Sequence, residues 1–353
     1  MKLALLAATL PTAASRDGHV ITDAPRRLAN RHHSGHIRSP VSSDGAHHHG
    51  ADRRTACIIL MTKNEWPTLR SWVLHHGDLV GFENLHVIDN SDEASSVEYI
   101  QRARDKYGIS VTYSKRGMEE KDEELTSTAL GMQPQCDFIF KLDTDEFLGV
   151  HQQAENTLRV DGNAFHAELR RLPMDGRKYL ITYRKELLKQ RVCRDNALAT
   201  DFGPIKVVGP YDSNPKMFYP ARSVVSIDTG SHTGMTTVDG LVKTNMAILH
   251  LHNKCYEVYM KNIKEILLSR DQISANQTDK ENFDALDRQK HRFTVWCGMK
   301  SCHKAREYHT YLKDPEGHRR DYVAGAAGGG EPQHALTALR DRVGQLQLKY
   351  GDV

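Results

Sequence analysis

The chain has 353 residues, which is enough for one large catalytic domain with appendages or for two smaller domains. Its apolar content of 39% suits a soluble globular protein, and 48 Lys and Arg residues against 45 Asp and Glu residues leave a net charge of only +3. This balance argues against a protein that binds nucleic acid through bulk positive charge, although a nucleotide can still bind at a local site.

The first 54 residues show no pattern of a folded domain. Met1–Ser15 combines one Lys, an apolar run from Leu3 to Leu10 and small residues, as a cleavable secretory signal does. The run is too short to span a bilayer, so membrane association would depend on this segment alone. The His- and Arg-rich tract that follows predicts a disordered leader. A cleaved signal would place the protein in the ER or Golgi lumen or outside the cell, and otherwise it is cytoplasmic.

Residues 56–148 alternate short apolar runs with helical patterns. We expect strands at Ala56–Met61, Leu85–Ile88, Ile109–Tyr113 and from Phe138, and helices after Pro67, at Val97–Tyr107 and at Glu119–Leu130. This order predicts an α/β fold with a mostly parallel sheet and right-handed crossovers.

The tract FIFKLDTDEFL, Phe138–Leu148, is an apolar run that ends in three carboxylates, Asp143, Asp145 and Glu146. Burying like charges together is costly unless a cation or protons compensate them, which favours a divalent metal held by oxygen ligands. The alternative is a solvated acidic turn after a core strand.

Further polar residues follow the first two predicted strands. Thr62, Asn64 and Glu65 come after the first strand, and Asp89 and Asn90 after the second. Ligands of open parallel sheets bind beyond the carboxyl ends of the strands, so these side chains should converge on one crevice. The sequence contains neither G-x-G-x-x-G after the first strand nor G-x-x-x-x-G-K-[ST], so it supports neither a dinucleotide fold nor a P-loop.

The segment from Phe165 to His232, after the acidic tract, is expected to form a further part of the site. Asp228 and His232, in DTGSHTG, are candidates for the catalytic base by position. Strands are expected around Phe165–Leu172, Tyr179–Tyr183, Met217–Tyr219 and Val224–Ile227, with a long polar loop at Arg194–Asn214.

Five short motifs occur in order between Ala56 and Arg270: ILMTKNE, W-x-x-H-H, VIDNSD, LDTDEF and a late HLHNK. Together they resemble GT-A glycosyltransferases of the family 2-like kind, including the family 92 (formerly DUF23) relatives. The resemblance implies a metal-dependent, inverting glycosyltransferase with a GT-A fold. It would move a sugar from a nucleotide-sugar donor, commonly a UDP-sugar, to a hydroxyl of a glycan, protein or lipid acceptor.

The same resemblance implies a donor-binding crevice in which Thr62, Glu65 and Asp89 meet the nucleoside. Lys216 or Lys254 would add positive charge beside the diphosphate. By position and resemblance together, the expected donor-binding residues are Thr62, Asn64, Glu65, Asp89, Asn90, Asp143, Lys216 and Lys254.

The implied metal ion is Mn²⁺ or Mg²⁺ bridging the diphosphate, with Asp143, Asp145 and His250 as its ligands, and contact with the diphosphate itself is the alternative role of His250. Contact with the ribose of the nucleotide is the alternative role of Asp143. Taken alone, a histidine in the strand MAILHLH is a core residue, and only the resemblance favours His250 as a ligand. His75 and His76, on the first helix, have capping or packing roles as alternatives to ligand contacts.

Two other functions stay open at this point. The first is a haloacid-dehalogenase-like phosphohydrolase, which also uses an aspartate pair but needs it after the first strand and followed by a small residue. Here the pair follows the fourth predicted strand and precedes Glu146-Phe147, which weakens this alternative. The second is a non-catalytic sugar-binding protein that retains the fold. Measuring the turnover of nucleotide sugars with and without EDTA distinguishes both alternatives from a glycosyltransferase.

The chain has six cysteines and one glycosylation sequon, Asn276-Gln277-Thr278, which are compatible with secretion without requiring it. Cys57 and Cys136 lie in or beside apolar strands and read as small buried hydrophobic residues. Cys297 and Cys302 are the better candidates for a disulfide.

We assign residues 55–312 to the glycosyltransferase-like domain, closed by an amphipathic helix at Cys255–Arg270. Residues 313–353 read as a flexible linker followed by a helix at Ala335–Leu348. Its apolar stripe predicts docking on its own domain or on a partner.

Overall fold

The computed structural model describes residues 54–115, 120–187, 205–208, 215–251, 255–268, 270–295, 300–325 and 334–351. The predicted signal segment and nearly all of the leader lie outside these residues, as do Lys254 and most of the loop predicted at 194–214. In the part of the chain that is described, no helix is both long and apolar enough to cross a membrane.

The described chain is a mixed α/β fold around a largely parallel sheet of seven strands, ordered β13-β7-β10-β4-β1-β2-β3. β1, β2, β3 and β4 run parallel, and β10 is antiparallel to both of its neighbours. The predicted α/β fold is confirmed. The strands are β1 (Ala56–Thr62), β2 (Leu85–Asp89), β3 (Ser110–Tyr113), β4 (Phe138–Leu142), β7 (Lys178–Ile181), β10 (Lys216–Pro220) and β13 (Leu241–Lys243).

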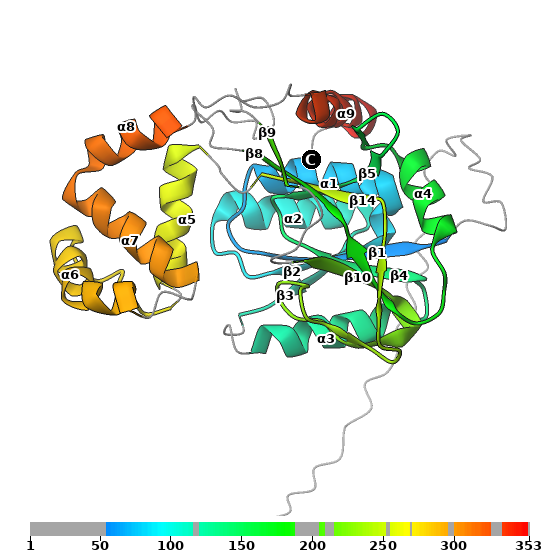
Figure 1. Ribbon diagram of the computed structural model, residues 1–353, viewed down its shortest axis with the longest axis horizontal. Coiled ribbons are helices and arrows are strands. Elements are labelled where there is room, and N and C mark those ends of the chain that lie inside the picture. Colours follow the sequence, from blue (N-terminus) through cyan, green and yellow to red (C-terminus); the bar gives the residue numbers. More distant parts are fainter. Residues whose placement is uncertain are drawn as a thin grey trace, which may run out of the picture. The chain divides into compact units, whose positions relative to one another are not determined.

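Helices cover both faces of this sheet (Figure 1): α1 (Thr68–Val80) and α2 (Ala94–Tyr107) on one, and α3 (Lys121–Met132) on the other. Side chains alternate along β1, so Ile58 and Leu60 join the core with α1 and α2, whereas Ile59 packs with α3. Gly108 ends α2 as predicted, in the left-handed conformation with φ of 75°.

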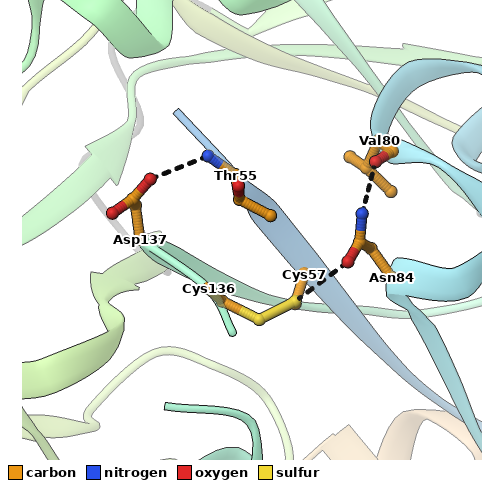
Figure 2. Close-up of a disulfide and its surroundings, with 6 residues drawn as sticks. All are labelled: Thr55, Cys57, Val80, Asn84, Cys136 and Asp137. Carbon is orange, nitrogen blue, oxygen red and sulfur yellow. Dashed lines mark hydrogen bonds between the residues drawn. A yellow bond between two sulfur atoms is a disulfide. The ribbon is translucent and has the colours of Figure 1, made fainter. Parts of the chain in front are cut away.

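A disulfide joins Cys57 in β1 to Cys136, two residues before β4 (Figure 2). The prediction that these cysteines are free hydrophobic residues is therefore wrong. β1 and β4 are parallel neighbours, and the backbone N–H of Thr55 donates to Oδ2 of Asp137 over 2.8 Å beside the sulfur atoms. No local pattern indicates this pairing, because 79 residues separate the two cysteines along the chain.

A second sheet has the order β6-β5-β14-β8-β9. It begins immediately after the acidic turn, so the tract Phe138–Leu148 forms two strands, and β4 ends at Leu142. β9 lies inside the predicted polar loop. The strands are β5 (Glu146–Gln152), β6 (Thr157–Arg159), β8 (Tyr183–Leu187), β9 (Ile205–Val208) and β14 (Met246–His250), and a separate short pair is β11 (Val224–Ser226) with β12 (Met235–Thr236).

The strand predicted at Phe165–Leu172 is a helix instead, α4 (Gly162–Arg171). Asp161 caps its N-terminus, accepting the N–H of Ala164 over 3.0 Å. Phe165 and Leu169, four residues apart, bury the same face. The cap and the helical spacing outweigh the apolar content from which the strand was predicted.

In the described chain, the first four helices after β14 share one apolar cluster. The predicted amphipathic helix at 255–270 is confirmed, but helix α8 occupies part of the predicted linker. Cys302 has a free thiol, so its predicted disulfide is wrong, whereas Cys255 is disulfide-bonded. The helices are α5 (Tyr256–Leu268), α6 (Asp279–Val295), α7 (Lys300–Lys313) and α8 (Pro315–Gly325).

The last helix, α9 (His334–Tyr350), docks on its own domain, which was one of the two predicted alternatives. Leu339 and Val343 belong to the main core together with residues of α1. Asp78 of α1 pairs with Arg342 and accepts from the Lys349 ammonium over 3.0 Å and the Tyr350 hydroxyl over 2.8 Å.

Candidate functional site

The carboxyl ends of β1, β2 and β4 meet at one edge of the central sheet. Thr62 pairs in register with Asp89, and the N–H of Asn90 donates to the Thr62 carbonyl over 3.0 Å. From the turn after β4, the Thr144 hydroxyl reaches the Thr62 hydroxyl over 3.2 Å. The structure thus brings together the predicted residues at the ends of three strands.

Asn64 ties the loop after β1 to the start of α2. Its Oδ1 accepts the N–H groups of Asp92 and Glu93, each over 3.0 Å, and its backbone adopts φ of 55°. Its Nδ2 donates to Oδ1 of Asp92 over 2.5 Å. The side chain predicted to meet the donor is therefore engaged in holding two loops together.

Asp89 carries an acceptor that the described protein leaves unpaired. Its Oδ1 accepts the N–H of Ser91 over 2.9 Å, whereas Oδ2 is buried with no hydrogen-bond partner. The residue is 2% exposed. A buried carboxylate oxygen without a donor is unfavourable, and an N–H or O–H group of a ligand would satisfy it.

Two buried lysines hold the acidic turn. Lys141 of β4 pairs with Oδ1 of Asp143, and the ammonium of Lys216, on the neighbouring strand β10, lies 3.0 Å from Oδ2 of Asp143 and 2.7 Å from Oε2 of Glu146. That Glu146 oxygen also accepts the N–H of Asp143 over 2.8 Å. The two lysines are only 1% and 4% exposed, whereas the Asp143 side chain is 46% exposed.

The electrostatics of this cluster favour its charged forms. Burial alone would raise the pKa of Asp143, but the Lys141 and Lys216 ammonium groups lower it well below its usual range. Burial would likewise lower the pKa of Lys216, and the Asp143 and Glu146 carboxylates raise it. The turn is therefore a fixed set of ion pairs at neutral pH.

Asp145 lies beside the late histidine, with its Oδ1 3.5 Å from Nε2 of His250. Arg184 of β8, which the sequence analysis missed, contacts Nδ1 of the same imidazole through Nη2. A guanidinium group can only donate, so Nδ1 is the acceptor and the neutral ring carries its proton on Nε2, facing Asp145.

The predicted metal ligands are each engaged by protein groups in this arrangement. Both oxygens of Asp143 are paired with lysines, and Nε2 of His250 carries a proton. Among the described residues, no group of three or more His, Cys, Asp and Glu side chains is placed to hold a metal ion. Lys141 and Lys216 compensate the charge of Asp143, and metal binding by Asp143, Asp145 and His250 stays a prediction.

The two base candidates have structural roles in the loop after β11. Asp228 accepts the N–H groups of Gly230, His232 and Thr233 over 3.2, 2.9 and 2.8 Å. Burial would raise the pKa of Asp228, but the amides of Thr233 and His232 lower it below its usual value. His232 donates from Nδ1 to the Pro215 carbonyl over 2.7 Å. Asp228 also lines a groove of about 600 Å³ beside α3. Their assignment as bases stays a prediction.

His75 and His76, of the W-x-x-H-H motif, are packing residues, which was one of the two predicted alternatives. Both are fully buried on α1, and both bond the backbone of Leu148 in β5. They pack against Phe147 with ring centroids 5.7 and 5.9 Å from it.

No protein-family model matches the sequence, and no curated protein matches it. Among solved structures, S. aureus TarS aligns with a TM-score of 0.32 and 9% identity over 84% of this chain and 53% of that one, so the chain spans about half of that protein. TarS 1–349 in complex with UDP-GlcNAc aligns with a TM-score of 0.31 and 9% identity over 84% and 88%. Mannose-1-phosphate geranyltransferase from Thermus thermophilus aligns with a TM-score of 0.25 and 9% identity over 80% and 71%. Likeness of this degree establishes neither family nor activity.

Proposed function

We propose that the protein is a GT-A glycosyltransferase that moves a sugar from a nucleotide-sugar donor, a UDP-sugar first of all, to a hydroxyl group of a glycan, protein or lipid. The observation that carries the proposal is the convergence of Asp89, Asp143 and Asp145 at the carboxyl ends of parallel strands, beside fixed cationic side chains. This edge is where open α/β sheets bind nucleotides.

The unpaired oxygen of Asp89 would accept a hydrogen bond from the nucleoside. Asp143, held by two lysines and partly exposed, would accept one from a donor hydroxyl, because each of its oxygens keeps a second lone pair. Both groups are hydrogen-bond acceptors, so they suit the base and sugar parts of a nucleotide rather than its phosphates.

Departure of a nucleoside diphosphate leaves negative charge that the site must stabilise. Arg184 places a guanidinium group beside His250 and Asp145. At about 4 Å and an effective dielectric near 20, one positive charge contributes ~4 kcal/mol before desolvation is counted. When bound, a divalent ion would supply further charge of this kind. Metal dependence and inversion of configuration stay predictions from the family resemblance.

The test is release of nucleoside diphosphate from a panel of UDP- and GDP-sugars by the full chain, with EDTA and with added Mn²⁺. Asp145→Asn removes a carboxylate expected to hold the metal ion and should lower release by roughly 100-fold or more, because the ion would stabilise the charge of the leaving diphosphate. Asp105→Asn, an equal change of charge at an exposed position of α2, should have no effect.

Three outcomes would contradict the proposal. Donor binding without release would favour a non-catalytic sugar-binding protein, and hydrolysis of simple phosphomonoesters would favour a phosphohydrolase. Undiminished release by the Asp145 variant would remove the acidic turn from the reaction. The EDTA arm separately decides the role of the metal.

A further inference from the structure

The sequon Asn276-Gln277-Thr278 lies in the turn that precedes α6. All three residues are exposed, and the N–H of Gln277 donates to the Ser274 carbonyl over 3.2 Å to close the turn. Within the described chain, the Asn276 side chain forms no hydrogen bond, so its amide nitrogen is accessible from solvent.

This turn is fixed to the helix that follows it. Asn282, 1% exposed, accepts the N–H of Ser274 over 3.0 Å and donates to its carbonyl over 3.2 Å. Glu281 accepts the N–H and hydroxyl groups of Thr278 over 2.7 and 2.9 Å, which caps α6. A large group on Asn276 would therefore stand on a stable turn without displacing buried side chains.

The cysteines provide a second, independent observation. Cys57 and Cys136 form a buried disulfide, and Cys255 is disulfide-bonded as well. Structural disulfides form and persist in oxidising compartments such as the ER lumen and are rare in the cytosol. Addition of glycans to Asn-x-Ser/Thr takes place on chains that enter this compartment.

We propose that Asn276 is a site of N-linked glycosylation. The donor is an oligosaccharide carried on a lipid diphosphate. The bond between the sugar C1 and the diphosphate oxygen breaks, a bond forms between C1 and Nδ2 of Asn276, and the amide loses one proton as the lipid diphosphate leaves. This modification does not depend on the proposed transferase activity.

The experiment is expression of the full chain, with its own N-terminus, in a eukaryotic secretory host, followed by intact mass measurement before and after peptide N-glycosidase. The expected result is loss of the mass of one glycan, with Asn276 converted to Asp in the released peptide. Asn276→Gln should abolish the loss, and Thr278→Ser, which keeps the sequon, should retain it.

The matched control is Asn156→Gln, because Asn156 is also an exposed asparagine in a turn but is followed by Thr157-Leu158 and forms no sequon. It should leave the mass loss unchanged. A wild-type mass that the enzyme does not alter would overturn the proposal, and so would a glycan that persists in Asn276→Gln. Recovery of an unglycosylated chain with reduced Cys57 and Cys136 would overturn it too, because the chain would then fold outside the oxidising compartment.

Discussion

His75 donates from Nε2 to the carbonyl oxygen of Leu148 over 2.8 Å. Its neighbour His76 accepts the N–H of the same residue over 3.2 Å and donates from Nδ1 to the Trp72 carbonyl. β5 pairs with β6 only from Val150 onward, so in the described chain no strand pairs with this side of Leu148. The two imidazoles therefore satisfy the backbone N–H and carbonyl groups of Leu148 in place of a neighbouring strand. The His76 ring must be neutral for this arrangement, and burial favours the neutral form of His75 by lowering its pKa.

The first prediction is that the protein loses stability in mild acid. Burial, the largest influence, lowers the pKa of His75 from 6.5 to about 4. Between these values the unfolded chain binds a proton that the folded chain does not. The free energy of unfolding therefore has its full value, as far as His75 is concerned, above pH 6.5. It falls as the pH drops towards 4, by roughly 3 kcal/mol in total. Urea unfolding at several pH values measures it.

The matched variant is His75→Gln, whose amide can donate to Leu148 but does not titrate. It should flatten the pH dependence of the unfolding free energy between pH 6.5 and 4 relative to wild type. An unchanged slope would show that other groups cause the acid sensitivity.

The second prediction concerns Lys216. Lys216→Met leaves the carboxylates of Asp143 and Glu146 without the ammonium group they share, which should cost about 3–5 kcal/mol of unfolding free energy. Adding Glu146→Gln should recover part of this loss, because one buried charge is then removed. Lys264→Met, at an exposed position of α5, is the control and should have little effect. Equal losses for both lysine variants would contradict the assigned role.

The third prediction is that the Cys57–Cys136 disulfide stabilises the fold. By the chain-entropy estimate, a disulfide across 79 residues contributes about 4–5 kcal/mol, so Cys57→Ala with Cys136→Ala should lower the unfolding free energy by up to that amount. Cys302→Ala, which removes a free thiol, should have a much smaller effect. Urea unfolding of the variants measures the difference, whereas a reductant would also break the disulfide at Cys255.

The fourth prediction distinguishes a structural role of Asp228 from a role as the general base. Asp228→Asn weakens the hydrogen bonds from three backbone amides, at a cost of roughly 2 kcal/mol, and should leave kcat for donor turnover almost unchanged. A general base is worth about 100-fold or more in rate. A fall of that size in kcat at unchanged stability would identify Asp228 as the base.

The parallel half of the fold was predictable because its signals are local. Apolar runs such as Ala56–Met61 and a stop signal such as Gly108 mark each element within a few residues. The errors involve distant partners or competing patterns. Cys57 and Cys136 meet only through the pairing of β1 with β4, and α4 depends on a cap at Asp161 that outweighs the strand-like composition after it.

The positions of the candidate site residues, though not their roles, were predictable for the same reason. Thr62 and Asp89 end β1 and β2 and Asp143 follows β4, so their placement at one edge of the sheet follows from parallel order. Lys141 and Arg184 were missed because a charged residue within a strand pattern reads as solvent-facing. The burial of Lys141 depends on Asp143 being beside it, and the contact of Arg184 with His250 depends on the pairing of β8 with β14.

The position of α9 bears on how the chain matures during synthesis. Leu339 and Val343 of α9 belong to the same core as Leu69 and Trp72 of α1, although α9 is far from α1 along the chain. A ribosome synthesises α9 long after α1. Until α9 has emerged, the growing chain therefore holds an uncovered face of α1, which makes this face a natural binding site for chaperones.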